Sequence, residues 1–152
     1  MPPAVKQEIE DFKAEVLNDY KTARISRECS LLGRKEVLTG KAKFGIFGDG
    51  KEVPQLAMAK AFLNGDFRSG YYRDQTLMLA LELATPESIL AQLYADTYND
   101  PFSKGRQMNS HFATPMIDSS KGEWINQMDQ YNSAADVSCT AGQMARALGL
   151  AF

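Results

Sequence analysis

Apolar residues recur through the first twenty positions at intervals of three and four, the spacing of one face of an α-helix. The members of this stripe are Val5, Ile9, Phe12, Val16 and Tyr20. Charged residues fill the positions between them, so the pattern predicts an amphipathic helix with one exposed face. Pro2 and Pro3 suit its start, because proline is tolerated in a first helical turn. We expect the helix to continue toward Leu31-Leu32 and to break near Gly33.

Glycines mark the next segment as a loop. Four of them fall between residues 39 and 50, where Gly48-Asp49-Gly50 has the composition of a turn. A second helix is expected from about Glu52 to Leu63, with Asn64-Gly65 as its stop. The short aromatic run from Phe67 to Tyr72 predicts a strand or an extended segment.

Helical signals return after this run. Asp74 is placed to cap a third helix that we expect to reach about Ala84. Thr85-Pro86-Glu87 predicts a new helix start, because it combines a capping hydroxyl, a first-turn proline and an acid at the positive helix end. The segment from Tyr98 to Gly122 has little periodicity, which is typical of a long functional loop.

The last part of the chain predicts one more strand and one more helix. We expect a short strand over Ala134 to Ser138 and a helix of small residues over Ala141 to Ala151. Thr140 and Gln143 have the spacing of a capping box at the start of that helix.

Composition narrows the classes of function. The net charge of −2 provides no basic face, so we expect no nucleic-acid partner. No apolar run is long enough to span a bilayer, and residues 1–10 lack the apolar centre of a signal peptide, so we expect no membrane partner. Cys29 and Cys139 are too few for a disulfide framework, which favours a cytoplasmic location. The single histidine, His111, argues against a zinc site.

Three short runs mix polar and aromatic residues in a way that core segments do not. These runs are Tyr71 to Thr76, Gly105 to Phe112 and Val137 to Gln143. Loops that a scaffold holds in place commonly carry binding residues. We therefore expect the three runs to be pieces of one cofactor site.

Two of the runs contain side chains that could be functional, and a purely structural role is the alternative for each of them. The guanidinium of Arg73 can fork onto phosphate oxygens, yet a surface arginine beside half-buried tyrosines explains the same residues more often. His111 is crowded by Arg106, Gln107 and Asn109 and could handle a proton or a carboxylate. A structural histidine that ties the loop down is the more frequent alternative.

The third run, Ser138 to Gly142, lies at the predicted strand-to-helix turn. Its small residues would let a flat ligand approach the backbone, although an ordinary N-cap would give the same sequence. Cys139 at a helix start has the position of a nucleophile, but its only histidine partner would be His111, and we do not favour that pair.

Four motifs in one order carry a family resemblance. They are Gly50-Lys51-Glu52-Val53, Tyr71 to Gln75, Gly105-Arg106-Gln107-Met108 with His111, and Val137-Ser138 with Thr140 to Gln143. Together they closely resemble the α subunit of thiamine-diphosphate-dependent 2-oxo acid dehydrogenases over about Phe44 to Phe152. The branched-chain (2-oxoisovalerate) type is the most similar, especially the bacterial form in which α and β parts are fused.

The resemblance implies cofactor-binding residues at matching positions. Tyr72 and Arg73 would hold the diphosphate of thiamine diphosphate. Ser138 and Thr140 would lie in the turn whose backbone contacts the aminopyrimidine ring. The resemblance assigns no catalytic residue to this chain.

Other implied positions surround that site. Gln107 and His111 would lie near the active-site entrance, and Phe47 would belong to the substrate-side loop that runs from Phe44. The segment with Cys139, Gly142 and Gln143 resembles one that holds a structural potassium ion in some members.

The chain also departs from the family. Cys139 and Ala145 stand where similar members usually have proline. Gly48-Asp49-Gly50 has no asparagine at the spacing of the magnesium-diphosphate motif, so we interpret it as a turn and expect the Mg²⁺ ligands beyond Phe152. The β part is also missing. We therefore expect an N-terminal fragment that is inactive alone.

The sequence thus predicts an α/β chain, the N-terminal part of a thiamine-diphosphate-binding fold with helices flanking an incomplete parallel sheet. We expect an N-terminal helical segment over 1–38 and the truncated cofactor domain over 39–152. The implied activity is oxidative decarboxylation of branched-chain 2-oxo acids with acyl transfer to lipoamide. Expected partners are a β subunit or fused β part and a lipoyl-bearing acyltransferase, in an oligomer. The alternatives are a non-catalytic binding or assembly module and a pyruvate or acetoin dehydrogenase α subunit.

Overall fold

The computed structural model describes residues 3–152. Its helices are α1 (Pro3–Leu38), α2 (Glu52–Ala61), α3 (Gln75–Ala80), α4 (Pro86–Leu93) and α5 (Gly142–Ala151). Its strands are β1 (Phe67–Ser69), β2 (Ile117–Asp118), β3 (Glu123–Trp124) and β4 (Asn132–Ala134), with a short 3₁₀ helix at Gln127–Asp129. The expected α/β class is confirmed at this level, because helices accompany a small parallel sheet.

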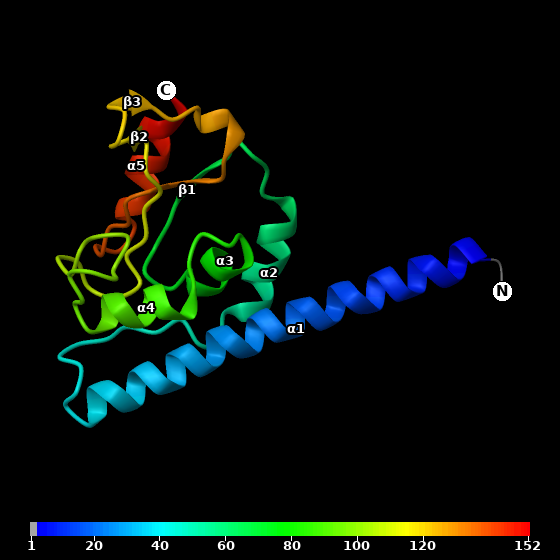
Figure 1. The fold of residues 1–152 in the computed structure, drawn as a ribbon, viewed down its shortest axis with the longest axis horizontal. Coiled ribbons are helices and arrows are strands. Elements are labelled where there is room, and N and C mark those ends of the chain that lie inside the picture. The colour runs from blue at the N-terminus through cyan, green and yellow to red at the C-terminus, as the bar shows by residue number, and fades with distance from the viewer. Residues whose placement is uncertain (1–2) are drawn as a thin grey trace.

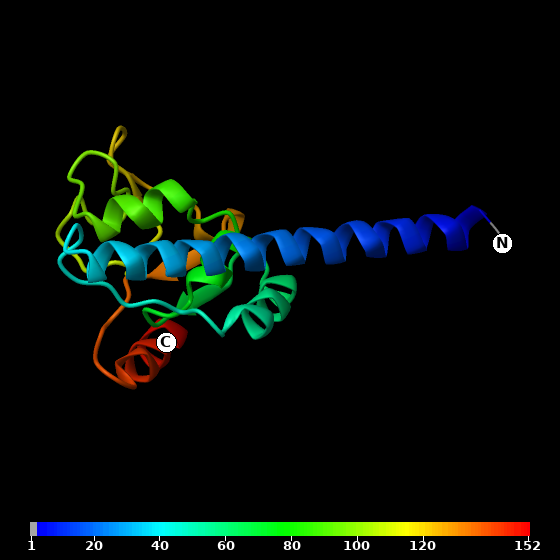
Figure 2. The same cartoon turned by 90° about the horizontal axis from the view of Figure 1, so that it is seen from below.

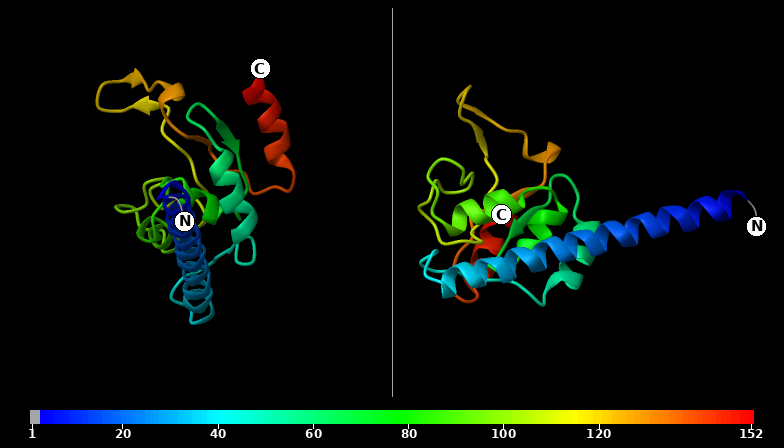
Figure 3. Two further views of the ribbon diagram at one scale, coloured as in Figure 1. Left: turned by 90° about the vertical axis from the view of Figure 1, so that its right-hand side faces the viewer. Right: turned by 60° about the horizontal axis from the view of Figure 1, so that its bottom comes forward.

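Helix α1 is the longest element and the base on which the others rest. Helices α2, α3 and α4 pack along its second half, while its N-terminal part extends beyond them (Figures 1 and 2). The view with the right-hand side of Figure 1 turned forward shows these elements on one side of α1 (Figure 3). The predicted helix is confirmed from Pro3, whereas Pro2 lies outside the described residues.

The predicted break near Gly33 is wrong, because α1 continues to Leu38. Gly33 is there for packing: a Cβ at this position would overlap Cε1 of Phe47. The missing side chain therefore lets the Phe47 ring lie against the helix. The helix stops just before Gly40, whose φ of +76° leaves the helical region.

The helices enclose a small core. Its buried members are Cys29, Met78, Ala84, Ile89 and Phe112. Phe112 meets Phe102 edge to face, with ring centroids 5.2 Å apart. A polar seam lies beside this core, where Ser26 Oγ on α1 is 2.7 Å from Thr76 Oγ1 on α3. Phe112 thus anchors the long 98–122 loop to the helices.

Helix α2 is fixed to α1 through its first residue. The carboxylate of Glu52 accepts two bonds from Arg27, at 2.7 and 2.9 Å, and also caps the backbone N–H of Gly50. The helix ends at Ala61, slightly before the expected Leu63. The Asn64-Gly65 stop follows, with Gly65 at a φ of +91°.

The parallel sheet consists of β1 and β4, which pair with Phe67 opposite Asn132 and Ser69 opposite Ala134. The strand expected over Ala134 to Ser138 is therefore wrong in its bounds, because β4 begins at Asn132 and ends at Ala134, and residues 135–138 are not strand. Strand β2 lies inside the segment predicted as a loop, from Tyr98 to Gly122, and pairs antiparallel with β3, which begins directly after that segment. Helix α5 packs on β1, where Ser69 Oγ donates to the carbonyl of Gln143 at 2.7 Å.

Three helix starts follow the sequence signals to different degrees. Thr85 caps α4 as expected, and its partner in the capping box is Ser88. The capping box expected from Thr140 and Gln143 is wrong, because the N-cap of α5 is Ala141 at a φ of +64° with no side-chain bond. Asp74 precedes α3 but does not cap it, since its carboxylate is directed to Arg68 instead.

Helix α3 also ends at Ala80 rather than Ala84. Glu82 takes a positive φ of 57°, and the backbone N–H of Leu83 turns back to the carbonyl of Met78. Over residues 3–152, no helix combines the length and the apolar character needed to cross a membrane.

Candidate functional site

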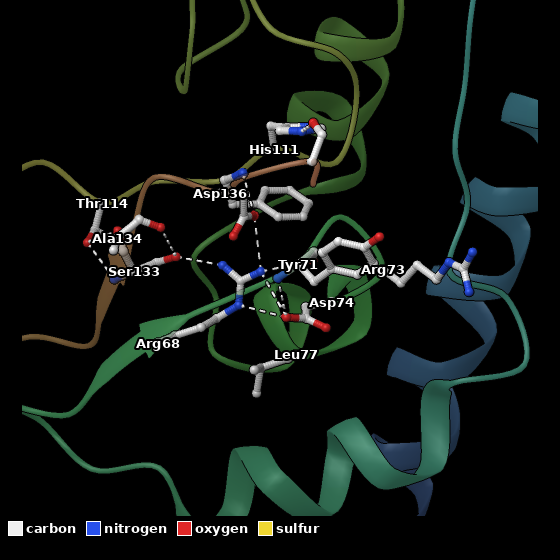
Figure 4. Close-up of polar contacts among 12 residues, drawn as sticks. Arg68, Tyr71, Arg73, Asp74, Leu77, His111, Thr114, Ser133, Ala134 and Asp136 are labelled. Carbon is white, nitrogen blue, oxygen red and sulfur yellow. Dashed lines mark hydrogen bonds and ion pairs between the residues drawn. The ribbon is translucent and has the colours of Figure 1, made fainter. Parts of the chain in front are cut away.

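Arg68 lies where the three polar runs of the sequence meet (Figure 4). It extends from β1, and only 5% of its side chain is exposed. The guanidinium donates to Asp74 and Asp136, and to the hydroxyl of Ser133 at 2.6 Å. We call Arg68, Asp74, Ser133 and Asp136 the Arg68 cluster.

Asp74 connects this cluster to the run that begins at Tyr71. Its Oδ2 atom accepts from Nη2 of Arg68 at 3.0 Å and from the backbone N–H of Tyr71 at 3.0 Å. Arg68 also donates to the carbonyl of Tyr71 at 3.2 Å. The backbone that leads to Arg73 is therefore fixed at both its N–H and C=O groups.

Asp136 connects the cluster to the other two runs. Its Oδ2 atom accepts from the N–H of Phe112 at 2.9 Å, and its own N–H donates to the carbonyl of Phe112 at 3.1 Å. Burial raises the pKa of the Asp136 carboxyl, although the charge of Arg68 acts in the opposite direction. Its second oxygen, Oδ1, is buried and has no hydrogen-bond partner among the described residues.

Gly70 is required by this arrangement. A Cβ at Gly70 would overlap Cζ of Arg68. Any larger residue would push the guanidinium away from its two carboxylates. The close approach explains a glycine directly after the strand.

The Tyr71-Tyr72-Arg73 segment lies at the surface beside the cluster. The two tyrosine rings have centroids 3.9 Å apart, and Nη2 of Arg73 lies 3.4 Å from the hydroxyl of Tyr72. The Arg73 side chain points away from the Arg68 cluster (Figure 4). Tyr72 is the one hydrogen-bond partner of this guanidinium among the described residues, so most of its N–H donors face solvent.

The phenol of Tyr71 lies close to Thr140 of the third run. Bonds first from Tyr72 and then from Thr140 lower the pKa of the Tyr71 phenol, while the bond to Tyr71 raises the pKa of Tyr72. Thr140 is exposed. The predicted pairs Tyr72–Arg73 and Ser138–Thr140 therefore lie on neighbouring loops.

His111 is a buried member of the second run and is held on every side. Its backbone exchanges two hydrogen bonds with the side chain of Gln92, at 2.7 and 3.0 Å. Nδ1 lies 3.2 Å from the carbonyl of Asn109, and Nε2 lies 2.5 Å from Oγ of Ser138. The imidazole thus joins the loop at 105–112 to the loop at 137–143, and its Nε2 contacts Ser138 rather than Cys139.

The structure does not bring the other two entrance residues into this group. Gln107 is exposed, and its N–H bonds to Ser103 at 3.0 Å. The ring of Phe47 lies against Gly33 and Gly45. The segments that contain Phe47 and Gln107 are nevertheless linked to each other, because the Asn109 side chain bonds the N–H and C=O of Ile46 at 3.0 and 2.7 Å.

The Gly48-Asp49-Gly50 run forms the expected turn. Asp49 pairs with Arg34 of α1 at 2.7 Å. A Cβ at Gly48 would lie 2.5 Å from the carbonyl oxygen of Arg73. The turn therefore touches the backbone of the candidate diphosphate residue.

The predicted potassium segment has one feature that fits a cation. The Oε1 atom of Gln143 is buried without a hydrogen-bond partner among the described residues. The carbonyls of Cys139 and Gln143 already accept from Gly142 N–H and Ser69 Oγ. Within residues 3–152, no group of three or more His, Cys, Asp or Glu side chains is arranged to hold a metal.

Sequence patterns do not single out Arg68 and Asp136, the residues that hold the runs together. An arginine inside a short strand, six positions before an aspartate, is the available signal for Arg68. Nothing local distinguishes Asp136, because its partners lie 24 and 68 positions earlier in the chain.

The chain was compared with protein-family models and with curated proteins, and neither comparison gives a match.

Proposed function

We propose that this chain binds the diphosphate group of thiamine diphosphate as part of the decarboxylating component of a 2-oxo acid dehydrogenase. The observation that carries the proposal is the convergence of three loops on the Arg68 cluster beside the exposed Arg73. A buried cation between two carboxylates fixes the loop backbones, so that the outward-facing groups are held in place before a ligand arrives.

The residues present fit a phosphate ligand. Arg73 offers a planar set of N–H donors, and the hydroxyl of Tyr72 lies beside it at 3.4 Å. Thr140 adds an exposed hydroxyl from the adjoining loop. These groups would bind and orient the diphosphate, with Ser138 and Thr140 at the ring end.

The chemistry of the reaction would belong to the cofactor. When bound, thiamine diphosphate would supply an electron sink for the electron pair that remains after a 2-oxo acid loses CO2. The chain's contribution would be orientation, charge and exclusion of water. We place no proton transfer on His111, because both of its ring nitrogens contact groups of the fold.

Within this proposal the substrate is a branched-chain 2-oxo acid of the 3-methyl-2-oxobutanoate type, and the acyl group passes to lipoamide on a partner. The Gly105-Arg106-Gln107-Met108 motif supports the branched-chain form. Substrate profiling of the dehydrogenase that contains this chain tests the choice. Faster turnover of pyruvate than of 2-oxoisovalerate would favour the pyruvate or acetoin type instead.

Calorimetric titration of the full chain with thiamine diphosphate, with and without Mg²⁺, tests the binding step. Inorganic pyrophosphate serves as a second probe that lacks the rings. Heat of binding from both ligands, lost in Arg73→Ala and retained in Arg24→Ala, would support the diphosphate role. Equal binding by the two variants would refute it.

A second function, that of a non-catalytic assembly module, is favoured by a separate observation. Residues 5–18 of α1 are all exposed, including Phe12 at 65%. A helix face with exposed apolar side chains is typical of an interaction surface. If the titration above shows no diphosphate binding, the assembly function is better supported than the cofactor-binding function.

A further inference from the structure

The apolar stripe of α1 begins on the part of the helix that extends beyond the other elements (Figure 2) and ends beside α2, where Val16 and Tyr20 line a hollow with Leu56. Its side chains are exposed by 38–65%, and they belong to Val5, Ile9, Phe12, Val16 and Tyr20. Their spacing matches one helix face, so they form a continuous ridge. Such a ridge in water is expected to be covered by a partner.

An apolar groove lies on the second half of the same helix, between α1 and α4. Its volume is about 890 Å³. The apolar side chains of Ile25, Leu31, Leu32 and Leu90 line it, and Lys21 and Lys35 stand at its edge. Neither lysine pairs with a carboxylate of the described residues. The groove therefore presents an apolar floor with a basic rim.

The charge of α1 changes sign between these two surfaces. Residues 5–20 contain five carboxylates and two lysines, whereas residues 21–35 contain five basic side chains and one carboxylate. The helix dipole does not account for this change of sign, because it acts within the first and last turns and the first turn of α1 contains no acid. Nor does it account for an apolar ridge on the acidic half and an apolar groove on the basic half.

We propose that two copies of this chain associate through antiparallel pairing of α1, with the ridge of each copy in the groove of the other. The two halves are complementary in charge and in apolar character, and only the antiparallel direction brings unlike halves together. A twofold axis near Tyr20 would make both contacts identical, as in an isologous dimer. The proposal is independent of cofactor binding, because none of these residues belongs to the candidate site.

The antiparallel arrangement makes a specific pairing prediction. Ile9 and Leu31 lie eleven positions before and after Tyr20, and both are exposed, by 38% and 45%. In the dimer Ile9 of one copy faces Leu31 of the other. Within one copy they are separated by roughly 33 Å along the helix, at 1.5 Å per residue, so they cannot meet.

Sedimentation velocity of the full chain over a range of concentrations is the first test. We expect a dimer that dissociates as ionic strength rises, because opposite charges contribute to the contact. Phe12→Glu should weaken dimerisation by about tenfold or more. Tyr98→Glu, which alters a side chain 88% exposed that belongs to neither the ridge nor the groove, is the matched control and should have no effect.

Cysteine cross-linking then tests the direction, in a Cys29→Ala/Cys139→Ser background with an added oxidant, because Cys29 is a free cysteine that lines the groove. The double variant Ile9→Cys/Leu31→Cys should form a disulfide-linked dimer, while each single variant should remain uncross-linked. A chain that is monomeric at every concentration, or a dimer insensitive to Phe12→Glu, would overturn the proposal. Cross-linking by either single variant would refute the antiparallel direction.

Discussion

Nη2 of Arg68 lies 3.0 Å from Oδ2 of Asp136, with both side chains almost completely removed from solvent. This ion pair spans 68 positions of sequence and holds the run after β4 against the run after β1. Taking either charge out of water is costly, and only its partner offsets that cost. The geometry of the candidate site therefore depends on a residue pair that touches no proposed ligand.

Removal of Arg68 should destabilise the fold strongly. Arg68→Ala leaves the Asp136 carboxylate buried without its cation, and we expect a loss of about 3–5 kcal/mol in the free energy of unfolding. Urea denaturation followed by circular dichroism measures it. Arg24→Ala, which breaks an exposed pair with Glu28, should cost about 1 kcal/mol or less. Equal costs for the two variants would contradict a buried role for Arg68.

Acid should weaken the contact between α1 and α2. Hydrogen bonds from Arg27 are the largest cause that lowers the pKa of Glu52 from 4.5 to about 2. The stabilisation is therefore complete above pH 4.5 and is lost as pH falls through about 2. Across this pH window the free energy of unfolding of the natural chain should fall by about 1–2 kcal/mol more than that of Glu52→Gln, because the variant lacks the titrating carboxylate. Thermal unfolding at several pH values measures the difference. The pKa of Asp136 is raised, so its contribution to stability changes with pH in the opposite direction. This contribution is present in both the natural chain and Glu52→Gln and does not affect their comparison.

Replacement of Arg73 should affect binding and leave stability unchanged. Its guanidinium is exposed and bonds only Tyr72 among the described residues, so Arg73→Ala removes no buried contact. In the proposed dehydrogenase we expect thiamine diphosphate affinity to fall by about 1.5–3 kcal/mol, the worth of a charge-assisted hydrogen bond. Equilibrium titration measures the affinity. An unchanged dissociation constant would reject the diphosphate role.

Two glycines should respond in opposite directions to the same substitution. A Cβ at Gly48 would meet the carbonyl oxygen of Arg73 at 2.5 Å, and a backbone atom cannot easily move, so Gly48→Ala should destabilise the fold by about 1–3 kcal/mol. A Cβ at Gly149 in α5 would project into open space, so Gly149→Ala should stabilise the helix by about 0.5–1 kcal/mol. Denaturant midpoints of both variants provide the comparison.

The sequence predicts most helices correctly because their signals are local. Thr85 with Pro86 starts α4 as expected, and the glycine-rich 39–50 segment is a loop. The predictions for Gly33 and Asp74 are wrong for one shared physical reason. Each residue has a distant partner, Phe47 for the glycine and Arg68 for the aspartate, and neither partner is visible in a local pattern.

The candidate site is predictable to a similar extent. Composition identifies the three polar runs, and they do meet in the fold. Residue types alone do not distinguish the exposed Arg73 from the buried His111, because both fit a loop with mixed chemistry. Exposure depends on which loops pack together, and that packing is set by Arg68 and Asp136.

The turn at Gly48 has a mechanical consequence. Two ion pairs connect this turn to α1, one between Asp49 and Arg34 and one between Glu52 and Arg27. On its other side, Gly48 lies close to the carbonyl oxygen of Arg73. The segment therefore connects the long helix to the loop that carries Arg73. A shift of α1 along its axis must either break one of these ion pairs or be transmitted to the backbone of Arg73.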